Sequence, residues 1–307
     1  MKEKAPAKKP YTGSKRNKPT SSPDKGKKNF NKKSAVVEKR KPVVVQKKSS
    51  KKTNTVSKPL VDKGLKSTDD SMRLNRFLAH AGIAARRKAD LLIASGVVTV
   101  NNLVVKEMGY RVKPTDVVKF KGKIVKPKTN FVYILLNKPK DTITTASDEK
   151  GRKTVLEIVA SATDERIFPV GRLDRNTTGV LLLTNDGDMA QKLSHPSFEV
   201  DKIYHATLDK PLLAEHFEQI RNGVTLEDGF AKVNDLGYPD LKDRTQVGIE
   251  IHIGKNRIVR RLFEHFGYQV VKLDRVMYAG LTKKDLTRGR HRMLTELEIA
   301  QLRKKTN

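Results

Sequence analysis

The segment FPVGRLDRNTTGVLLLTNDGD (168–188) contains the residue best placed to do chemistry in this chain. Asp174 follows Arg172 and precedes a polar turn, and a strongly apolar run begins at Gly179. A carboxylate beside a basic residue, at the mouth of an apolar strand, is in a position where reactive groups occur. The simpler alternative is that Asp174 caps the turn, because Asp is a common turn residue, and spacing alone favours this alternative.

Neither the histidines nor the other acidic residues predict a metal site. Asp186, Asp188 and Asp201 could suggest a two-metal nuclease. However, NDGD (185–188) is more simply a turn followed by a helix N-cap at Asp188, since Asp-Gly is a strong turn signal. The spacing between the histidines matches no metal-ligand pattern; the histidines considered are His195, His205, His252 and His265.

A basic cluster indicates a second kind of chemistry, the binding of phosphate. Arg86, Arg87 and Lys88 open a predicted helix, where backbone N–H groups also favour phosphate. Taken alone, the cluster is more simply a solvated charged face. Further basic residues that could widen this surface are Arg73, Arg76 and Lys106.

The overall charge agrees with a polyanionic partner. The 307 residues carry a formal net charge of +30. Residues 1–70 contain 22 Lys and Arg but 6 Asp and Glu, so about +14 remains on the rest of the chain. Because both parts are basic, nucleic acid is the expected partner. A charge that only keeps the chain soluble is an equally good explanation for the tail by itself.

Two absences in the sequence narrow the class of protein. The chain has no cysteine, which excludes disulfides, thiolate nucleophiles and cysteine metal sites. It has no apolar run long enough for a membrane span and no apolar secretion signal at its start. We therefore expect a cytoplasmic protein.

The pattern of apolar residues predicts a disordered tail over residues 1–70 and a small domain over 72–130. The tail is too polar to bury a core. Next come a helix from about 72 to 81, a second helix from about 85 to 95 and a β-hairpin over 97–105. Asn101-Asn102 forms the hairpin turn, since Asn tolerates positive φ. A further strand is predicted at 117–120.

The remaining residues, 131–303, predict a larger domain of the α+β class with a mainly antiparallel mixed sheet flanked by helices. Continuous apolar runs predict buried strands at 131–137 and 180–184. Alternating runs predict half-exposed strands at 201–209 and 247–253. Helices are predicted at 212–223 and 257–267, each ending in Gly.

The segment RLNRFLAHAGIAARRKADLLIASGVVTVNNLVV (73–105) resembles the small RNA-binding domain named after ribosomal small-subunit protein S-four. That family combines two helices with a hairpin and places basic residues on the first turn of the second helix. This sequence has Ala85 where the family often has Ser, and Asn102 where it often has Gly. The resemblance implies that residues 72–130 bind RNA.

Most of residues 72–300 resembles the pseudouridine synthases that modify ribosomal RNA. GRLDRNTTG (171–179) resembles their catalytic motif, and SHPSFEVDKIY (194–204) the motif with the active-site tyrosine. LLNKPKDTITTASDEKGRKTVLEIV (135–159) resembles their first motif, with Asp141 in place of the usual Gly. GKNRIVRRLFEHFGYQVVKLDRV (254–276) resembles their basic motif, with Ile258 in place of a frequent Gln.

The resemblance implies a role for each matched residue. Asp174 attacks the sugar or removes a proton from it, and Tyr204 stacks on the flipped uracil. Arg260 pairs with Asp174 and keeps it ionised. Arg172 fills the gap that the flipped base leaves, and no cofactor or metal is needed. The residues expected to bind RNA are Arg73, Arg76, Arg86, Arg87, Lys88, Arg172, Arg257 and Arg261.

The stretches EVDKIY (199–204) and GVTLEDG (223–229) look most like the members that modify large-subunit ribosomal RNA. The expected protein is therefore a monomeric 23S RNA pseudouridine synthase, acting on free RNA or on an assembling subunit. The alternatives are 16S RNA as substrate, and a non-catalytic RNA-binding protein of ribosome assembly. For the catalytic residues, the alternatives are structural roles. Asp174 would cap a turn, Tyr204 would be a core residue, and Arg260 would contact a phosphate or form a salt bridge within its helix.

Overall fold

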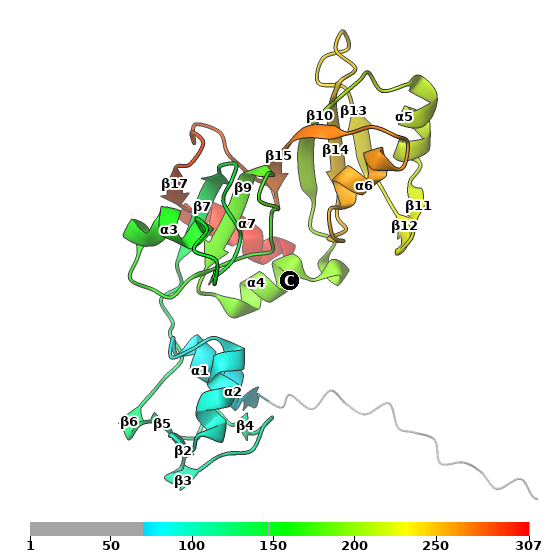
Figure 1. Cartoon of the computed structure of the whole chain (residues 1–307). Coiled ribbons are helices and arrows are strands. Elements are labelled where there is room, and N and C mark those ends of the chain that lie inside the picture. The colour runs from blue at the N-terminus through cyan, green and yellow to red at the C-terminus, as the bar shows by residue number, and fades with distance from the viewer. Residues whose placement is uncertain (1–69, 147, 307) are drawn as a thin grey trace, which may run out of the picture. The chain divides into compact units, whose positions relative to one another are not determined.

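A computed structural model of the chain describes residues 70–146 and 148–306 (Figure 1). The tail predicted for residues 1–70 falls outside these ranges except for Asp70. Within them, no helix combines the length and the apolar character that crossing a bilayer requires. The described residues contain both predicted modules, a small helical and β module and a larger sheet.

The small module packs two helices on a short sheet. Leu74 and Leu78 of the first helix and Ile93 of the second are buried in one apolar core. The predicted hairpin turn is confirmed, because Asn101 and Asn102 both have positive φ, 50° and 68°. The elements are β1 (Met72–Arg73), α1 (Leu74–His80), α2 (Arg86–Ala94), β2 (Val98–Val100), β3 (Leu103–Val104), β4 (Arg111–Val112), β5 (Val118–Phe120) and β6 (Lys123–Ile124).

The larger module is built on a nine-stranded sheet in which seven strands follow the order β13-β14-β10-β15-β9-β7-β17. All of its strand pairs are antiparallel except β9 with β15, which confirms the predicted mainly antiparallel mixed sheet. Its strands are β7 (Tyr133–Lys138), β8 (Phe168–Pro169), β9 (Thr178–Thr184), β10 (Lys202–Leu208), β13 (Asp235–Gly237), β14 (Gln246–Ile251), β15 (Val270–Tyr278), β16 (Leu281–Thr282) and β17 (His291–Met293), and a separate hairpin consists of β11 (Val224–Leu226) and β12 (Gly229–Ala231).

Helices bury the two faces of this sheet in two apolar cores. One core receives α3, α5 and α6, and the other receives α4 and α7. Ile134 and Leu136 of β7 enter the first core, while Tyr133 and Leu135 enter the second. The helices are α3 (Val155–Val159), α4 (Gly187–Ser194), α5 (Ala214–Arg221), α6 (Ile258–Glu264) and α7 (Glu296–Lys305).

The two kinds of apolar pattern correspond to two environments in the sheet. The continuous runs became β7 and β9, in which every residue is buried. The alternating runs became β10 and β14, in which buried and partly exposed residues alternate along most of each strand. The strands predicted from continuous apolar runs and those predicted from alternating runs are therefore both confirmed.

One predicted helix cap is wrong by two residues. Helix α4 begins at Gly187, and the carboxylate of Asp186 accepts hydrogen bonds from the backbone N–H groups of Asp188 and Met189. Asp186, rather than Asp188, is therefore the N-cap. Asp188 lies in the first turn, where its negative charge interacts favourably with the helix dipole.

The parallel junction between β9 and β15 joins the two halves of the sheet. Only two residue pairs form it, Thr178 with Asp274 and Gly179 with Arg275. Gly179 has φ +107°, and a Cβ there would lie 2.1 Å from the carbonyl oxygen of Arg275. Only glycine permits this approach of the two backbones.

We predict that Gly179→Ala will lower the free energy of unfolding by about 3 kcal/mol, because the new methyl group overlaps backbone and the backbone angle disfavours a side chain. Chemical denaturation of the purified variant measures this loss. Gly237→Ala is the matched control, since no heavy atom beyond the adjacent residues lies within 4 Å of a Cβ at that position in β13. A similar stability for both variants would contradict the close approach.

Candidate active site

A cavity of about 160 Å³ lies across the β9–β15 junction. Asp174 reaches it from the loop between β8 and β9, and Tyr204 from β10. The other lining residues are Val170, Gly171, Arg172, Leu173, Thr177, Ser194, Lys202, Ile253, Gly254, Lys255, Arg257, Ile258, Val259, Leu273, Arg275 and Tyr278. Segments far apart in the sequence thus contribute to one pocket.

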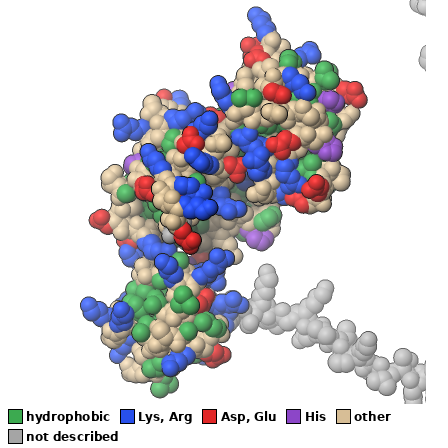
Figure 2. All heavy atoms as spheres, viewed as in Figure 1, with side chains coloured by type: hydrophobic (Ala, Val, Ile, Leu, Met, Phe, Trp, Pro, Cys, Tyr) green, Lys and Arg blue, Asp and Glu red, His purple; other side chains and the backbone are tan. Residues whose placement is uncertain are grey.

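The charge around the cavity is unbalanced. Its lining contains one carboxylate, on Asp174, and five cationic side chains, on Arg172, Lys202, Lys255, Arg257 and Arg275. Figure 2 shows many further Lys and Arg side chains on one face of the larger module. Such a surface attracts the phosphate backbone of a nucleic acid.

Asp174 lies in a loop whose backbone carbonyl groups accept hydrogen bonds from a buried lysine. Lys138, at the end of β7, has no exposed surface. Its ammonium group donates to the carbonyl oxygens of Asp174 at 3.0 Å, Arg175 at 3.2 Å and Thr177 at 2.8 Å. Burial lowers the pKa of Lys138 to about 8, and the nearby Asp174 carboxylate opposes this effect. Lys138 therefore fixes the backbone that presents Asp174.

Three further hydrogen bonds, which involve Thr144 and Asp141, hold the same loop. The hydroxyl of Thr144 donates to the carbonyl oxygen of Leu173 at 2.8 Å and accepts from its N–H at 3.3 Å. The N–H of Asp141 donates to the carbonyl oxygen of Arg175 at 3.0 Å. Asp141 has φ +60°, which explains why glycine suits this position.

Tyr204 is both a core residue and a pocket residue. Its side chain is 9% exposed and belongs to the first apolar core, yet it also lines the cavity beside Asp174. A tyrosine ring in that position can stack on a flat base that enters the pocket. The hypothesis that Tyr204 is a core residue and the hypothesis that it stacks on a base are therefore compatible.

Arg260 lies near Asp174 but has a different hydrogen-bond partner. Its guanidinium donates to the carbonyl oxygen of Val270 at 2.5 Å, and the side chain is 9% exposed. Burial, and then Arg257, lower the pKa of Arg260, while Asp174 and Glu264 raise it. In the described residues, Arg260 and Asp174 form no ion pair, although each feels the charge of the other.

Apart from Arg261, the residues predicted to bind RNA occupy three places. Arg172 and Arg257 are exposed at the cavity, and Arg257 forms an ion pair with Glu264 at 3.3 Å. Arg86, Arg87 and Lys88 are exposed in the first turn of α2, and Arg73 and Arg76 lie at the start of α1 and within it.

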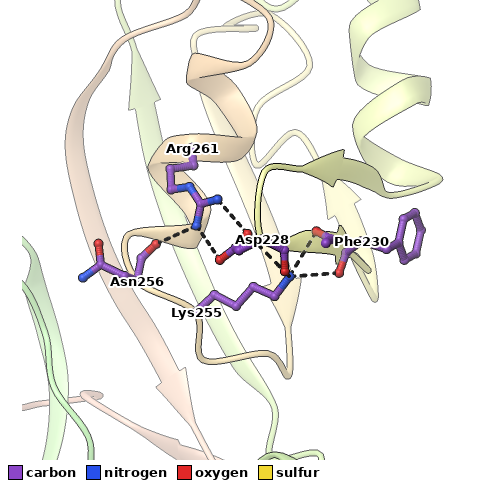
Figure 3. A network of polar contacts seen from close by, with 6 residues as sticks. Asp228, Phe230, Lys255, Asn256 and Arg261 are labelled. Atoms are coloured by element: carbon purple, nitrogen blue, oxygen red, sulfur yellow. Dashed lines mark hydrogen bonds and ion pairs between the residues drawn. The ribbon is translucent and has the colours of Figure 1, made fainter.

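Arg261 stabilises a loop instead of facing the pocket (Figure 3). Its guanidinium makes two hydrogen bonds to the carboxylate of Asp228, at 2.7 and 2.9 Å, and these lower the pKa of Asp228 to about 2. Lys255 donates to the carbonyl oxygens of Asp228 at 2.7 Å and Gly229 at 3.0 Å. We call this network of Asp228, Lys255 and Arg261 the hairpin clamp, because it ties the β11–β12 turn to the pocket loop 254–257.

The sequence patterns did not single out several residues that the structure brings to the site, namely Lys138, Thr144, Lys202, Lys255 and Arg275. The positions of Lys138 and Arg275, inside or at the end of an apolar strand, could have indicated them. Burying a charge costs free energy, so a charged residue in such a place often has a function. Among the described residues, no group of three or more His, Cys, Asp or Glu could hold a metal ion.

Comparisons with known proteins agree with this fold. Residues 132–265 match the family model described as RNA pseudouridylate synthase, and residues 72–118 match the S4 domain. The ribosomal large subunit pseudouridine synthase B of Bacillus subtilis is 43% identical over 75% of this chain and 95% of its own length. An uncharacterized RNA pseudouridine synthase of Aquifex aeolicus is 39% identical over 75% of this chain and 93% of its own.

A solved structure also resembles the chain. The crystal structure of a pseudouridylate synthase superimposes with a TM-score of 0.54 at 27% identity, covering 76% of this chain and all of that one. Fold and site define an enzyme that acts on RNA, with an RNA-binding module that precedes the catalytic one in the sequence. The chain belongs to the RNA pseudouridylate synthases, isomerases that convert uridine to pseudouridine.

We predict that Lys138→Met will lower the single-turnover rate more than tenfold and the free energy of unfolding by about 2 kcal/mol, since carbonyl groups around Asp174 lose their donor. Rate measurements at saturating RNA and chemical denaturation test both effects. Lys140→Met, which changes an exposed lysine two residues away, should behave like the wild type. A wild-type rate in Lys138→Met would show that the loop holds its position without the lysine.

We predict that Asp228→Asn will slow isomerisation about fivefold, because an amide makes weaker bonds to Arg261 and Lys255 and loosens the loop at the pocket. Single-turnover kinetics on RNA measures this change. The control is Glu218→Gln, which removes an exposed carboxylate whose only ion pair in the described residues joins Arg221 within α5. Equal rates for Asp228→Asn and the wild type would contradict a role for the hairpin clamp.

Proposed function

We propose that this enzyme isomerises uridine in 23S ribosomal RNA, the RNA of the large subunit. The observation that carries the proposal is the pocket that holds a single carboxylate, on Asp174, beside the Tyr204 ring and among five cations. The choice of the large subunit is supported by the Bacillus subtilis relative, whose name gives that substrate and which aligns over nearly its full length.

In this proposal each central residue of the pocket has one step. A uridine leaves its helix and enters the cavity, and the Tyr204 ring replaces part of the lost stacking. The Asp174 carboxylate then attacks the anomeric carbon of the sugar or removes a neighbouring sugar proton, and the bond to the ring nitrogen breaks. The uracil turns, and carbon five bonds to the anomeric carbon as the Asp174–sugar bond breaks or, on the second route, as the removed proton returns to the sugar. Carbon five then gives up its proton, and the ring nitrogen takes one up.

Arg260 acts in this proposal through its charge. It lies close enough to Asp174 for each charge to affect the other, and its low exposure strengthens that effect because little water screens it. In this proposal the positive charge orients the carboxylate toward the substrate. Arg172 stands at the entrance, where it can fill the gap that the flipped base leaves.

The alternatives differ from this proposal in substrate or in chemistry. A 16S RNA substrate would use the same pocket. A non-catalytic protein of ribosome assembly would have no need for a carboxylate placed by Lys138 and Thr144. The proposal also places the enzyme in the cytoplasm as a monomer, with ribosomal RNA as its partner, either free or in an assembling subunit.

We predict that Asp174→Asn will abolish isomerisation but preserve RNA binding, because the amide keeps the shape of the carboxylate and removes the nucleophile and base. Mapping pseudouridine in the ribosomal RNA of cells that carry only this variant tests the prediction. One or more 23S positions should lose the modification. Asp164→Asn, at an exposed carboxylate outside the pocket, is the control. Full modification at every site with Asp174→Asn would refute the assignment, and a loss confined to 16S RNA would replace the substrate.

A further inference from the structure

Arg275 is an unusual residue for the floor of a pocket. Its side chain is 2% exposed and lines the cavity. The Nε–H donates to the carbonyl oxygen of Val180 at 2.8 Å, but Nη2 is buried and has no hydrogen-bond partner in the described part of the chain. Buried donors in proteins are almost always satisfied, so an unpartnered one at a binding pocket indicates a group that arrives with the ligand.

Lys202 is a second cation in the same pocket with a donor to spare. Its ammonium group donates to the carbonyl oxygens of Val200 at 2.8 Å and His252 at 2.5 Å. An ammonium group has three protons, so one more bond is possible. Burial, and then the charge of Arg275, lower the pKa of Lys202 to about 8, while Asp201 acts in the opposite direction.

The sheet places these two cations beside Tyr204. Lys202 and Tyr204 are two residues apart on β10 and therefore share one face. Arg275 lies directly opposite Tyr204 on β15, and Tyr278 lies opposite Lys202. The register shifts between these pairs, so that β15 has one extra residue, Val276.

This bulge has a consequence for the direction of the side chains. Residues three apart on a regular strand point to opposite faces, but the extra residue turns Arg275 and Tyr278 to the same side. The Arg275 guanidinium lies 4.5 Å from the centre of the Tyr278 ring, and both residues line the cavity. Lys202, Arg275 and the two tyrosines therefore form one wall of the pocket.

Within the described part of the chain, no carboxylate pairs directly with the positive charge of this wall. Neither Lys202 nor Arg275 forms an ion pair with a carboxylate among residues 70–146 and 148–306. RNA offers two kinds of negative group, a backbone phosphate and the base as it leaves the sugar. Phosphates suit the exposed cations Arg172 and Arg257 at the entrance, whereas Arg275 is too deeply buried for the backbone to reach.

We propose that Arg275 and Lys202 bind the carbonyl oxygens of the target uracil and stabilise the negative charge that the ring gains when its bond to the sugar breaks. The bonding pair stays on the ring nitrogen and spreads to both carbonyl oxygens. Donors aimed at developing charge in a dry pocket speed a reaction more than donors in water do. The same contacts hold the ring as carbon five approaches the sugar. The inference rests on the proposed use of this pocket by Asp174.

The test compares variants at both positions at saturating RNA. The substrate is an unmodified 23S RNA transcript with tritium at carbon five of its uridines, since isomerisation releases that tritium. We expect Arg275→Met and Lys202→Met to lower the single-turnover rate about a hundredfold, with RNA affinity within about threefold of the wild type. Arg275→Lys, which keeps a positive charge, should recover about tenfold of that loss.

The matched control is Arg292→Met. Arg292 lies in β17 and is paired with Glu298, outside the pocket, so its loss tests the general effect of removing an arginine. Its rate should stay within about twofold of the wild type, because surface changes away from a site have small effects. Thermal unfolding of every variant identifies any that fail to fold. If Arg275→Met fails to fold, Arg275→Lys and Lys202→Met decide the outcome, and if Lys202→Met fails to fold, the two Arg275 variants decide it.

A second transcript, made with 5-fluorouridine, separates stabilisation of the base from support of the fold. Fluorine makes uracil a better leaving group, which reduces the need for the two cations. The rate of its consumption, followed by nucleoside chromatography, should therefore fall at least threefold less in Arg275→Lys than the rate on uridine does. An equal loss on both transcripts, or a wild-type rate in the variants, would overturn the inference. A wild-type enzyme that acts on 16S transcripts alone would refute the 23S proposal, and the same comparison would then be made on 16S RNA.

Discussion

The short parallel pairing of β9 with β15 is the constraint on which the rest of the site depends. It joins the half of the sheet that carries the Asp174 loop to the half that carries Tyr204 and Arg275. Two residue pairs form it, and the hydroxyl of Thr178 adds a hydrogen bond to the Asp274 carboxylate at 2.8 Å. Because Gly179 lacks a side chain, the two halves approach closely enough for one pocket to span both.

The pocket meets two electrostatic requirements that apply to many enzymes with a polyanionic substrate. It has to attract a charged polymer and yet keep a carboxylate ionised and free to react. Here the carboxylate of Asp174 is held by its own backbone, through Lys138 and Thr144, and not through an ion pair in the described residues. The side chain therefore stays available to the substrate.

The pocket loop 254–257 is tied to the β11–β12 turn by charged groups of the basic motif, one of which, Arg261, the sequence predicted to bind RNA. Arg261 and Lys255 lie in the basic motif, but their strongest contacts are to the β11–β12 turn (Figure 3). A bidentate arginine–carboxylate pair is both strong and directional, which suits a loop that must keep its shape. Basic residues near a nucleic-acid site thus serve two purposes, to bind the ligand and to hold the loops that bind it.

The sequence by itself determined the element types, the mixed sheet and the family, because apolar periodicity and motif order depend on residues close together in the chain. It also marked Asp174 and Tyr204 through their motifs. Only the tertiary structure decided that Arg260 donates to Val270, that Arg261 pairs with Asp228 and that Arg275 shares a wall with Lys202. These contacts depend on strand register, on a bulge at Val276 and on a glycine between strands, which join residues far apart in the sequence and leave no local pattern.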